Sequence, residues 1–143
     1  MQTFLPFPDF KKSIQCLDNK RLGKQRVEAL QILNILRGRT ESNAWSNHPA
    51  VLMWRDYEHA LNHYLLESIY EWIKRGFKNS IRGENPLVIN YEKPFWLGNE
   101  EFHASHKSNL LRKDLSWYGK FGWKEPDNLS YIWPVKMFKG RIK

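Results

Sequence analysis

The spacing of apolar residues between positions 17 and 38 predicts the first long helix of the chain. One side of this segment is apolar at helical steps: Leu22, Val27, Ala29, Leu30, Leu33 and Leu36. Asp18 precedes the pattern, and its carboxylate is expected to accept hydrogen bonds from the amides of the first turn. Gly38 is expected to end the helix in the left-handed conformation, which glycine adopts without strain.

A second stripe of the same helix begins polar and ends apolar. It consists of residues that follow one another at helical spacing: Arg21, Gln25, Glu28, Ile32 and Ile35. The first half of the helix thus keeps its charged side chains away from the apolar side. This arrangement indicates a helix that presents charge, either to a partner or to solvent.

Three further helices are predicted. The longest periodic segment starts at Pro49, which suits a first helical turn, and ends in the basic turn before Gly76. Asn99 is a candidate N-cap for a helix over 100–111, and a short helix is predicted over 10–16. The long helix from 49 to 76 is expected to form the centre of the core.

The remaining segments have no helical period. A polar loop is predicted over 38–47, with Trp45 as its one anchor, and prolines and a glycine break the segment 77–97 around a candidate extended piece at 86–90. The aromatic tail after residue 114 is expected to wrap over the helices. The sequence therefore predicts a mostly α, compact single domain of three main helices with long aromatic-rich loops.

The chain is strongly basic, with 23 Lys and Arg against 15 Asp and Glu. Nucleic acid is the commonest polyanion inside a cell, and these basic residues are spread along the chain rather than gathered in one membrane-binding helix. A basic surface that is merely solvated is the alternative. We expect no signal peptide and no transmembrane segment, and a cytoplasmic or nucleoid-associated protein.

Two basic clusters are candidates for phosphate contacts. The first lies on the first long helix: Lys20, Arg21, Lys24, Gln25 and Arg26. The second lies towards the end of the third long helix: His106, Lys107, Ser108, Arg112 and Lys113. His48 and His103 are further candidates for DNA contacts. Cationic, hydroxyl and amide side chains are common phosphate ligands, and two such clusters in a basic domain favour nucleic acid over the alternative of a solvated surface.

Aromatic residues make up 15% of the chain. Most are expected in the core, because large rings supply much of the burial in a small domain. Others are candidates to stack on exposed bases, as in single-strand-binding and base-flipping proteins. Composition alone does not separate the two groups.

Metal binding and cysteine nucleophiles are not predicted. His103 and His106 can share a helix face, but zinc requires three or four nitrogen or sulfur ligands, and the one cysteine is distant in sequence. The competing interpretation places His106 half-buried and His103 at the surface. Cys16 is expected to be a buried side chain that forms no intrachain disulfide. We therefore expect neither a metal nor a cofactor.

Three motifs carry a resemblance to a known family. The aromatic run of the predicted 49–76 helix ends in Lys74-Arg75-Gly76-Phe77, and Phe102-His-Ala-Ser and Trp117-Tyr-Gly-Lys-Phe-Gly follow later. With the arginines of the first long helix, these motifs resemble the pyrimidine-dimer DNA glycosylases, the phage endonuclease V family. The chain is also similar to a bacterial branch related to endonuclease V, whose members begin Met-Gln-Thr-Phe-Leu-Pro and carry Arg-Leu-Gly-Lys-Gln-Arg-Val-Glu.

The resemblance implies an endonuclease V-like fold and a nucleophilic mechanism. In the family, the chain's own α-amine, freed by removal of Met, attacks C1′ of a damaged nucleoside and forms an imine, assisted by a glutamate on the first helix. An α-amine suits this step because its reference pKa of about 7.7–8.0 leaves a neutral fraction at physiological pH. The resemblance also implies double-stranded DNA as the partner, with one nucleotide extruded from the stack.

The chain departs from the family pattern at both catalytic points. Initiator Met is normally removed only before small residues, so with bulky Gln2 the free amine would belong to Met1. The family's Arg-Glu-Leu-Pro-Arg is matched by Arg21-Leu-Gly-Lys-Gln-Arg26, which has no carboxylate between its arginines. The resemblance assigns Arg21 and Arg26 to phosphate or base-pocket contacts, but the family's glutamate has no counterpart.

Two nearby acids are candidates to replace that glutamate. Glu28 shares a helix face with Arg21, and Asp18 lies one turn before it. Either carboxylate could hold an arginine towards phosphate or stabilise a developing oxocarbenium ion. The alternatives are that Asp18 only caps the helix and Glu28 only pairs with a neighbouring cation. The candidate catalytic residues are thus Glu28, Asp18 and Met1.

We predict a monomeric base-excision protein. It is expected to be a DNA glycosylase that acts on damaged or modified bases, and the sequence leaves open whether it also has AP-lyase activity. The alternative is a non-catalytic nucleic-acid-binding domain on the same scaffold, which the missing glutamate and bulky Gln2 favour. A third possibility, that the anionic partner is a nucleotide or another small molecule, depends only on the polar helix face and the histidines.

Overall fold

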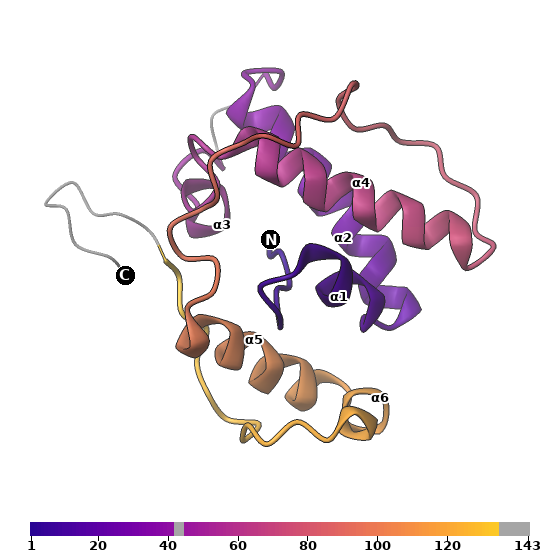
Figure 1. The fold of residues 1–143 in the computed structure, drawn as a ribbon, viewed down its shortest axis with the longest axis vertical. Coiled ribbons are helices and arrows are strands. Elements are labelled where there is room, and N and C mark those ends of the chain that lie inside the picture. Colours follow the sequence, from indigo (N-terminus) through magenta and orange to yellow (C-terminus); the bar gives the residue numbers. More distant parts are fainter. Residues whose placement is uncertain (42–44, 135–143) are drawn as a thin grey trace, which may run out of the picture.

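The computed structural model describes residues 1–41 and 45–134, in which helices joined by long loops form the fold (Figure 1). Three long helices are present, α2 (Asn19–Leu36), α4 (Glu58–Lys74) and α5 (Glu100–Lys113). The short elements are α1 (Phe10–Gln15), α3 (Pro49–Leu52), α6 (Leu115–Tyr118) and a 3-10 helix over Gly119–Phe121. No strand occurs in the described ranges, so the prediction of a mostly α fold with three main helices is confirmed.

The two longest helices pack against each other, and α1 packs on α4. Their shared core contains side chains from every part of the helical pair, among them Leu22, Leu33, Leu61 and Leu65, all fully buried. Gly23 lets the two helices approach, because a Cβ atom there would lie 3.0 Å from the Trp72 ring of α4. Of the predicted apolar side of α2, Leu22, Ala29 and Leu33 are fully buried, whereas the expectation for Val27 is wrong, because its side chain is 41% exposed.

Both long helices of this pair end at the glycines that the sequence indicated. Gly38 has a φ of 71°, and the next residue, Arg39, donates its N–H to the carbonyl of Asn34 at 2.8 Å. Gly76 closes α4 in the same way with a φ of 93°. A Schellman motif therefore satisfies the last carbonyl groups of each helix.

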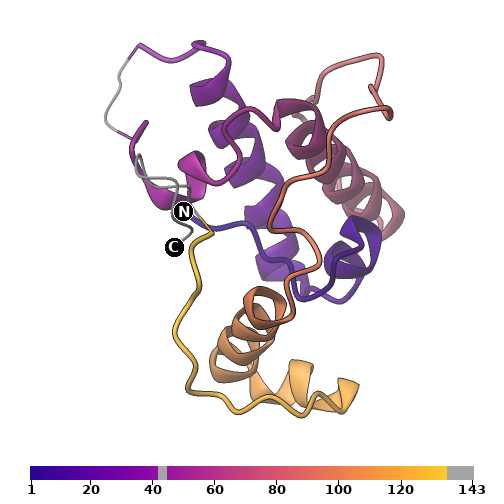
Figure 2. The ribbon, with the colours of Figure 1, turned by 60° about the vertical axis from the view of Figure 1, so that its left-hand side comes forward.

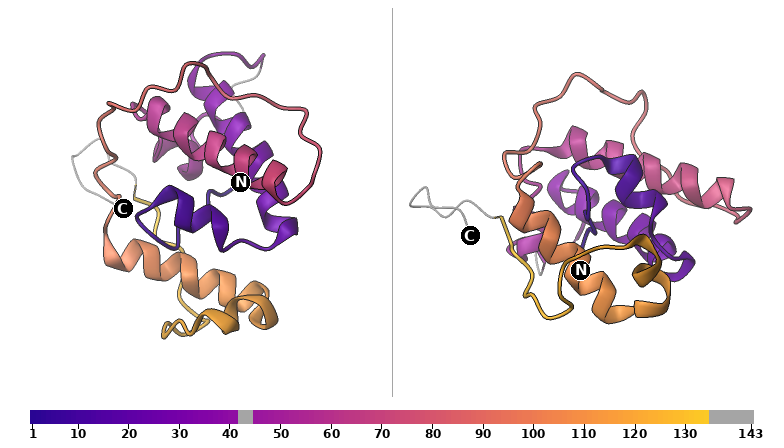
Figure 3. Two further views of the ribbon diagram at one scale, coloured as in Figure 1. Left: turned by 45° about the vertical axis from the view of Figure 1, so that its right-hand side comes forward. Right: turned by 60° about the horizontal axis from the view of Figure 1, so that its bottom comes forward.

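The first residues pass between α5 and the α2–α4 pair (Figures 1, 2 and 3), and residues 2–6 are buried there. Phe4 and Leu5 are buried. The backbone of this segment belongs to no helix, so side chains from the surrounding helices must satisfy its polar groups. The chain's beginning is therefore part of the core.

The predicted long helix over 49–76 is broken, and that part of the prediction is wrong. The chain leaves α3 after Leu52 and starts α4 only at Glu58. Between them Asp56 has a φ of 71°, which no α-helix tolerates, and the Met53 carbonyl accepts a hydrogen bond from the Trp96 indole at 2.9 Å. A tertiary hydrogen bond thus occupies a carbonyl that a continuous helix would have used.

Two loops complete the fold. The segment 77–97 arches around the outer side of α4 (Figure 3), and the candidate extended piece at 86–90 forms no strand. After the 3-10 helix the tail runs back along α5, where Ser108 accepts from the N–H of Leu129 at 2.9 Å. Residues 42–44 of the predicted polar loop lie outside the described residues. Among the described helices, none is long and apolar enough to cross a bilayer.

Candidate functional site

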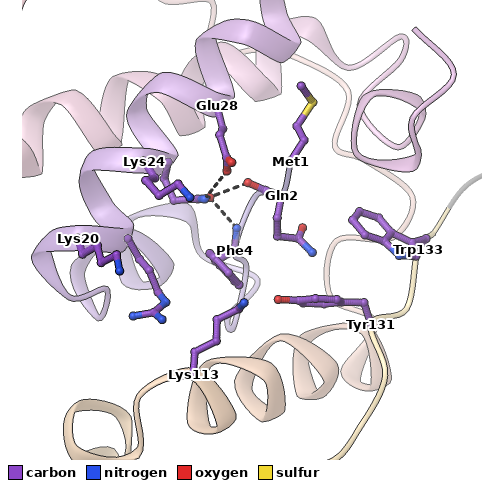
Figure 4. A pocket seen from close by; sticks show the side chains of 11 residues that line it. Met1, Gln2, Phe4, Lys20, Lys24, Glu28, Lys113, Tyr131 and Trp133 are labelled. Atoms are coloured by element: carbon purple, nitrogen blue, oxygen red, sulfur yellow. Dashed lines mark hydrogen bonds between the residues drawn. The ribbon is translucent and has the colours of Figure 1, made fainter. Parts of the chain in front are cut away.

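A pocket of about 390 Å³ lies where α2, the N-terminal segment, the end of α5 and the returning tail meet (Figure 4). It is lined by side chains from all four: Met1, Gln2, Phe4, Lys20, Arg21, Lys24, Gln25, Glu28, Lys113, Tyr131 and Trp133. The stripe of α2 that was expected to present charge faces this pocket. Residues that are far apart in the sequence thus share one concave surface.

The pocket is cationic. Lys20, Arg21 and Lys24 come from the first turns of α2, and Lys113 reaches it from the last turn of α5. The positive end of the α2 dipole lies at the same place, since the helix begins at Asn19. This part of the pocket is suited to a phosphate group.

Asp18 orients Arg21. Both oxygens of its carboxylate accept from Arg21 Nη1 at 3.2 Å, and one also accepts from the buried hydroxyl of Tyr118. Burial and the neighbouring Asp18 raise the pKa of Tyr118, so the phenol stays a donor. The expected capping bond is absent: Asp18 occupies the N-cap position of α2 without a side-chain bond to the first turn. Its oxygens are directed to these two partners instead.

Gln25 fixes the beginning of the chain. Its carbonyl oxygen accepts from the N–H of Phe4 at 2.7 Å and from the Tyr64 hydroxyl at 2.7 Å. Its NH₂ group donates to the carbonyl of Gln2 at 2.9 Å and to the carboxylate of Glu28 at 3.2 Å, as the dashed lines in Figure 4 indicate. This buried amide holds the first residues and Glu28 in one arrangement, and it has a structural role beside its place in the pocket.

The two histidines of α5 hold the same segment from the other side. His106 Nδ1 accepts from the N–H of Leu5 at 2.8 Å, and His103 Nδ1 pairs with the Leu5 carbonyl at 2.7 Å. His103 Nε2 accepts from Gly98 at 2.9 Å, so Nδ1 carries the proton and donates. Burial lowers the pKa of both residues, that of His106 to about 3. The interpretation that placed His106 half-buried and His103 at the surface is wrong, because both side chains are buried where they bond the backbone of Leu5.

Most of the other candidate DNA contacts lie away from the pocket. Arg26 points to the far side of α2, where its guanidinium stacks over Trp72 and donates to Asn79 at 2.7 Å. Lys107 lies over the Phe7 ring, 4.9 Å from its centroid. Arg112 and Ser108 bond the returning tail, and Ser108 is fully buried. In the second basic cluster, Lys113 is the residue that lines the pocket.

His48 lies beside the pocket without lining it. Its Nδ1 accepts from the N–H of Ala50 at 3.0 Å and caps α3. Its ring meets that of Trp133, a pocket residue, edge to face at 5.8 Å. Partial burial and the charge of the N-terminal amine lower the pKa of His48.

The tail of the chain supplies aromatic side chains to the pocket. Tyr131 and Trp133 of the tail form one wall of the pocket in Figure 4, and no motif in the sequence had singled them out for this. The described residues contain no group of three His, Cys, Asp or Glu side chains that could hold a metal ion. Cys16 is buried, as expected, and burial raises the pKa of its thiol to about 12.

The sequence model of a protein family described as pyrimidine dimer DNA glycosylase matches residues 1–84, more than half of the chain. The chain belongs to this family. Membership in the pyrimidine dimer DNA glycosylases confirms the resemblance and supports DNA glycosylase activity in general, with DNA as the substrate. Searches of curated proteins and of solved structures find no match.

The matched region of the chain covers the α2 side of the pocket and the chain's beginning. It includes Met1, Arg21, Gln25 and Glu28. Helix α5 and the tail lie beyond the matched region, although they supply the rest of the lining. The pocket is therefore completed by elements that the family match does not cover.

Proposed function

We propose that this protein is a DNA glycosylase that excises a damaged or modified base through the α-amine of Met1. The observation that carries the proposal is that Met1, Glu28 and the cations Lys20, Arg21 and Lys24 line one pocket. A nucleophile, a carboxylate and phosphate-binding groups are what base removal at C1′ requires. The proposal includes cleavage at abasic sites, because an imine makes that step accessible.

The cations bind the phosphates next to the damaged nucleotide. Arg21 is suited to this because Asp18 holds its guanidinium in place at the pocket wall. Lys113 approaches from α5 on the opposite side. Asp18 thereby acts as a positioning residue for Arg21 rather than on the reacting atoms.

The amine lone pair of Met1 forms a bond to C1′ while the bond between C1′ and the base breaks. The base leaves with the electrons of its broken bond to C1′ and takes up a proton. The nitrogen, now a secondary ammonium, loses a proton. Its regained lone pair then expels O4′, which is protonated, and leaves a protonated C1′=N imine. Loss of a C2′ proton breaks the C3′–O bond by elimination, which cuts the strand. Extrusion of the nucleotide precedes these steps, because C1′ within the stack is inaccessible.

Glu28 is the carboxylate that we propose to assist the departure of the base. Its negative charge stabilises the positive charge that develops on the sugar as the base departs. Gln25 is unsuited to proton transfer, since its amide does not titrate and its oxygen and nitrogen already hold Phe4 and Gln2. Glu28 therefore takes the role that the family's glutamate plays, and Gln25 orients it at 3.2 Å.

The test uses duplexes with ultraviolet damage, with single modified bases and with an abasic site, each incubated with protein and borohydride. We expect a covalent complex in which mass spectrometry locates the DNA on the N-terminal peptide. Glu28→Gln is expected to lower base release at least tenfold while DNA binding persists. Lys11→Ala, an exposed change on α1 outside the pocket, is the control.

Three outcomes count against parts of this proposal. Base release without any trapped complex indicates hydrolysis by water and removes Met1 as nucleophile. Binding without release or trapping on every duplex favours the non-catalytic DNA-binding domain. If Met1 is formylated or acetylated in the purified protein, its α-amine is blocked, and this result also removes Met1 as the nucleophile.

A further inference from the structure

Arg75 ends α4 and belongs to the Lys74-Arg75-Gly76-Phe77 motif, to which the proposed function gives no role. Its side chain is 17% exposed, and it does not line the pocket. Glu71, one turn earlier in α4, accepts from Arg75 Nε at 2.8 Å. This charge-assisted bond fixes the plane of the guanidinium, so that its remaining N–H groups are held in one orientation.

These N–H groups hold the corner between α1 and α2, residues 15–19. Nη1 donates to the Leu17 carbonyl at 2.7 Å and to the side-chain oxygen of Asn19 at 3.0 Å. Nη2 donates to the Gln15 carbonyl at 3.1 Å. One guanidinium thus bonds both the last residue of α1 and the first residue of α2. The planar fork of arginine makes this possible, whereas lysine has a single donor atom.

Helix α6 bonds the same corner from another side. Trp117 donates its indole N–H to the Cys16 carbonyl at 2.8 Å, and the Tyr118 hydroxyl accepts from the N–H of Asp18 at 3.1 Å. Three consecutive carbonyls, those of residues 15, 16 and 17, therefore accept from side chains that are 60, 101 and 58 residues away in the sequence. Carbonyls at the end of a helix have no partner within it, so these side chains determine how the chain turns into α2.

The corner determines the position of Asp18. Asp18 directly follows the three carbonyls, and its side chain makes no capping bond to α2. Both oxygens of its carboxylate instead accept from Arg21, which lines the pocket. A chain of hydrogen bonds thus leads from Arg75 through the corner to Asp18 and on to Arg21.

We propose that Arg75 is a positioning residue for DNA binding, because it holds the corner in the conformation in which Asp18 directs Arg21 to a DNA phosphate. The inference rests on the proposed function in one respect, the contact of Arg21 with phosphate. Arg75 acts through Arg21 and not as a phosphate ligand, since four of its five N–H groups donate to Glu71 and to the corner.

The test is Arg75→Lys, which keeps the positive charge and removes the fork. DNA affinity is measured by fluorescence anisotropy on abasic duplex, with the substitution made in the unsubstituted chain and in Arg21→Ala. In the unsubstituted chain we expect a loss of about fivefold, which is typical of residues coupled in one hydrogen-bond network. In Arg21→Ala the same change should alter the affinity by less than about 1.5-fold, because the cation through which Arg75 acts is absent.

Two further variants make the result specific. Lys74→Ala removes a positive charge from the exposed neighbour of Arg75, and it should lower the affinity to the same small extent in both backgrounds. Circular dichroism checks that each variant is folded. If Arg75→Lys does not fold, Trp117→Phe takes its place, because it removes the donor to the Cys16 carbonyl and keeps a ring and the net charge. The same pair of results is expected from it.

The two backgrounds separate positioning from a general effect on the fold. Equal losses in the unsubstituted chain and in Arg21→Ala, or no loss in either, overturn the positioning role while the glycosylase stands. The proposed function fails in a different way. If Arg21→Ala binds abasic duplex as tightly as the unsubstituted chain does, the phosphate contact of Arg21 is removed, and this inference is removed with it.

Discussion

The backbone N–H of Leu5 donates a 2.8 Å hydrogen bond to Nδ1 of His106. The histidine belongs to α5, outside the region that the family model matches, whereas Leu5 lies at the chain's beginning inside it. With Gln25 bonded to Phe4 from the opposite side, the first residues are held between two helices. The position of Met1 at the pocket therefore depends on α5 as much as on α2.

Acid should unfold this protein because of these histidines. Burial holds the pKa of His106 at about 3, while an unfolded histidine titrates near 6.5, so between these values the unfolded state binds more protons. Stability is then fully present above pH 6.5 and falls as the pH is lowered towards 3. The expected loss is about 1.4 kcal/mol per pH unit for each such histidine.

Urea unfolding at a series of pH values measures this loss. His106→Gln keeps an acceptor for Leu5 but cannot titrate, so it should flatten the pH dependence. His59→Gln, an exposed position on α4, is the matched control. A stability that stays level from pH 7 to pH 4 would be inconsistent with a neutral, buried His106.

Gln25→Leu should destabilise the fold and displace the chain's beginning. The change preserves size but leaves the N–H of Phe4 and the carbonyl of Gln2 without their buried partner, whereas the Tyr64 hydroxyl keeps the Phe4 carbonyl as an acceptor at 2.8 Å. A buried polar group without a partner costs about 1–3 kcal/mol, so a loss of about 2–4 kcal/mol in the free energy of unfolding is expected. Thermal and urea unfolding give the value.

A neighbouring substitution provides the comparison for this result. Gln31→Leu removes an exposed amide from the same helix and should leave the free energy of unfolding within about 0.5 kcal/mol. Equal stability of the two variants would show that Gln25 does not hold the N-terminal segment.

Lys24→Ala should weaken DNA binding in a salt-dependent way. The ammonium lines the cationic pocket, and each phosphate contact contributes about 0.9 to the slope of log K against log salt concentration. We expect the slope to fall by about that amount, measured by fluorescence anisotropy on abasic duplex. Lys11→Ala removes the same charge from α1, and an identical slope change there would point to net charge rather than to the pocket.

Tyr118→Phe should make the position of the Arg21 side chain less fixed, although Tyr118 itself does not line the pocket. Asp18 would lose one of its donors, and we expect a loss of about 1–2 kcal/mol in the free energy of unfolding. Because Asp18 then holds Arg21 less firmly, DNA affinity should fall several-fold while the salt slope stays the same. A variant that binds DNA as well as the unsubstituted chain would remove Tyr118 and Asp18 from the positioning of Arg21.

Local periodicity predicted much of the α2 side of the site. Arg21, Gln25 and Glu28 were expected to share one face, and all three line the pocket. Arg26 was expected in the same group, yet it lies on the other side of the helix over Trp72. The position of a residue in the sequence determines the helix face on which it lies, but it does not determine which part of the protein packs against that face.

The sequence by itself determined the three main helices apart from the start of α4, the glycine ends of α2 and α4, the change of the α2 stripe from polar to apolar, and the family. Those features depend on residues within a few turns of one another. The tertiary structure decided that His103 and His106 hold Leu5, that Lys113 and Trp133 join the pocket, and that the helix from 49 to 76 is broken. Each of these depends on a hydrogen bond or contact across tens of residues, and its partner is known only once the chain has folded.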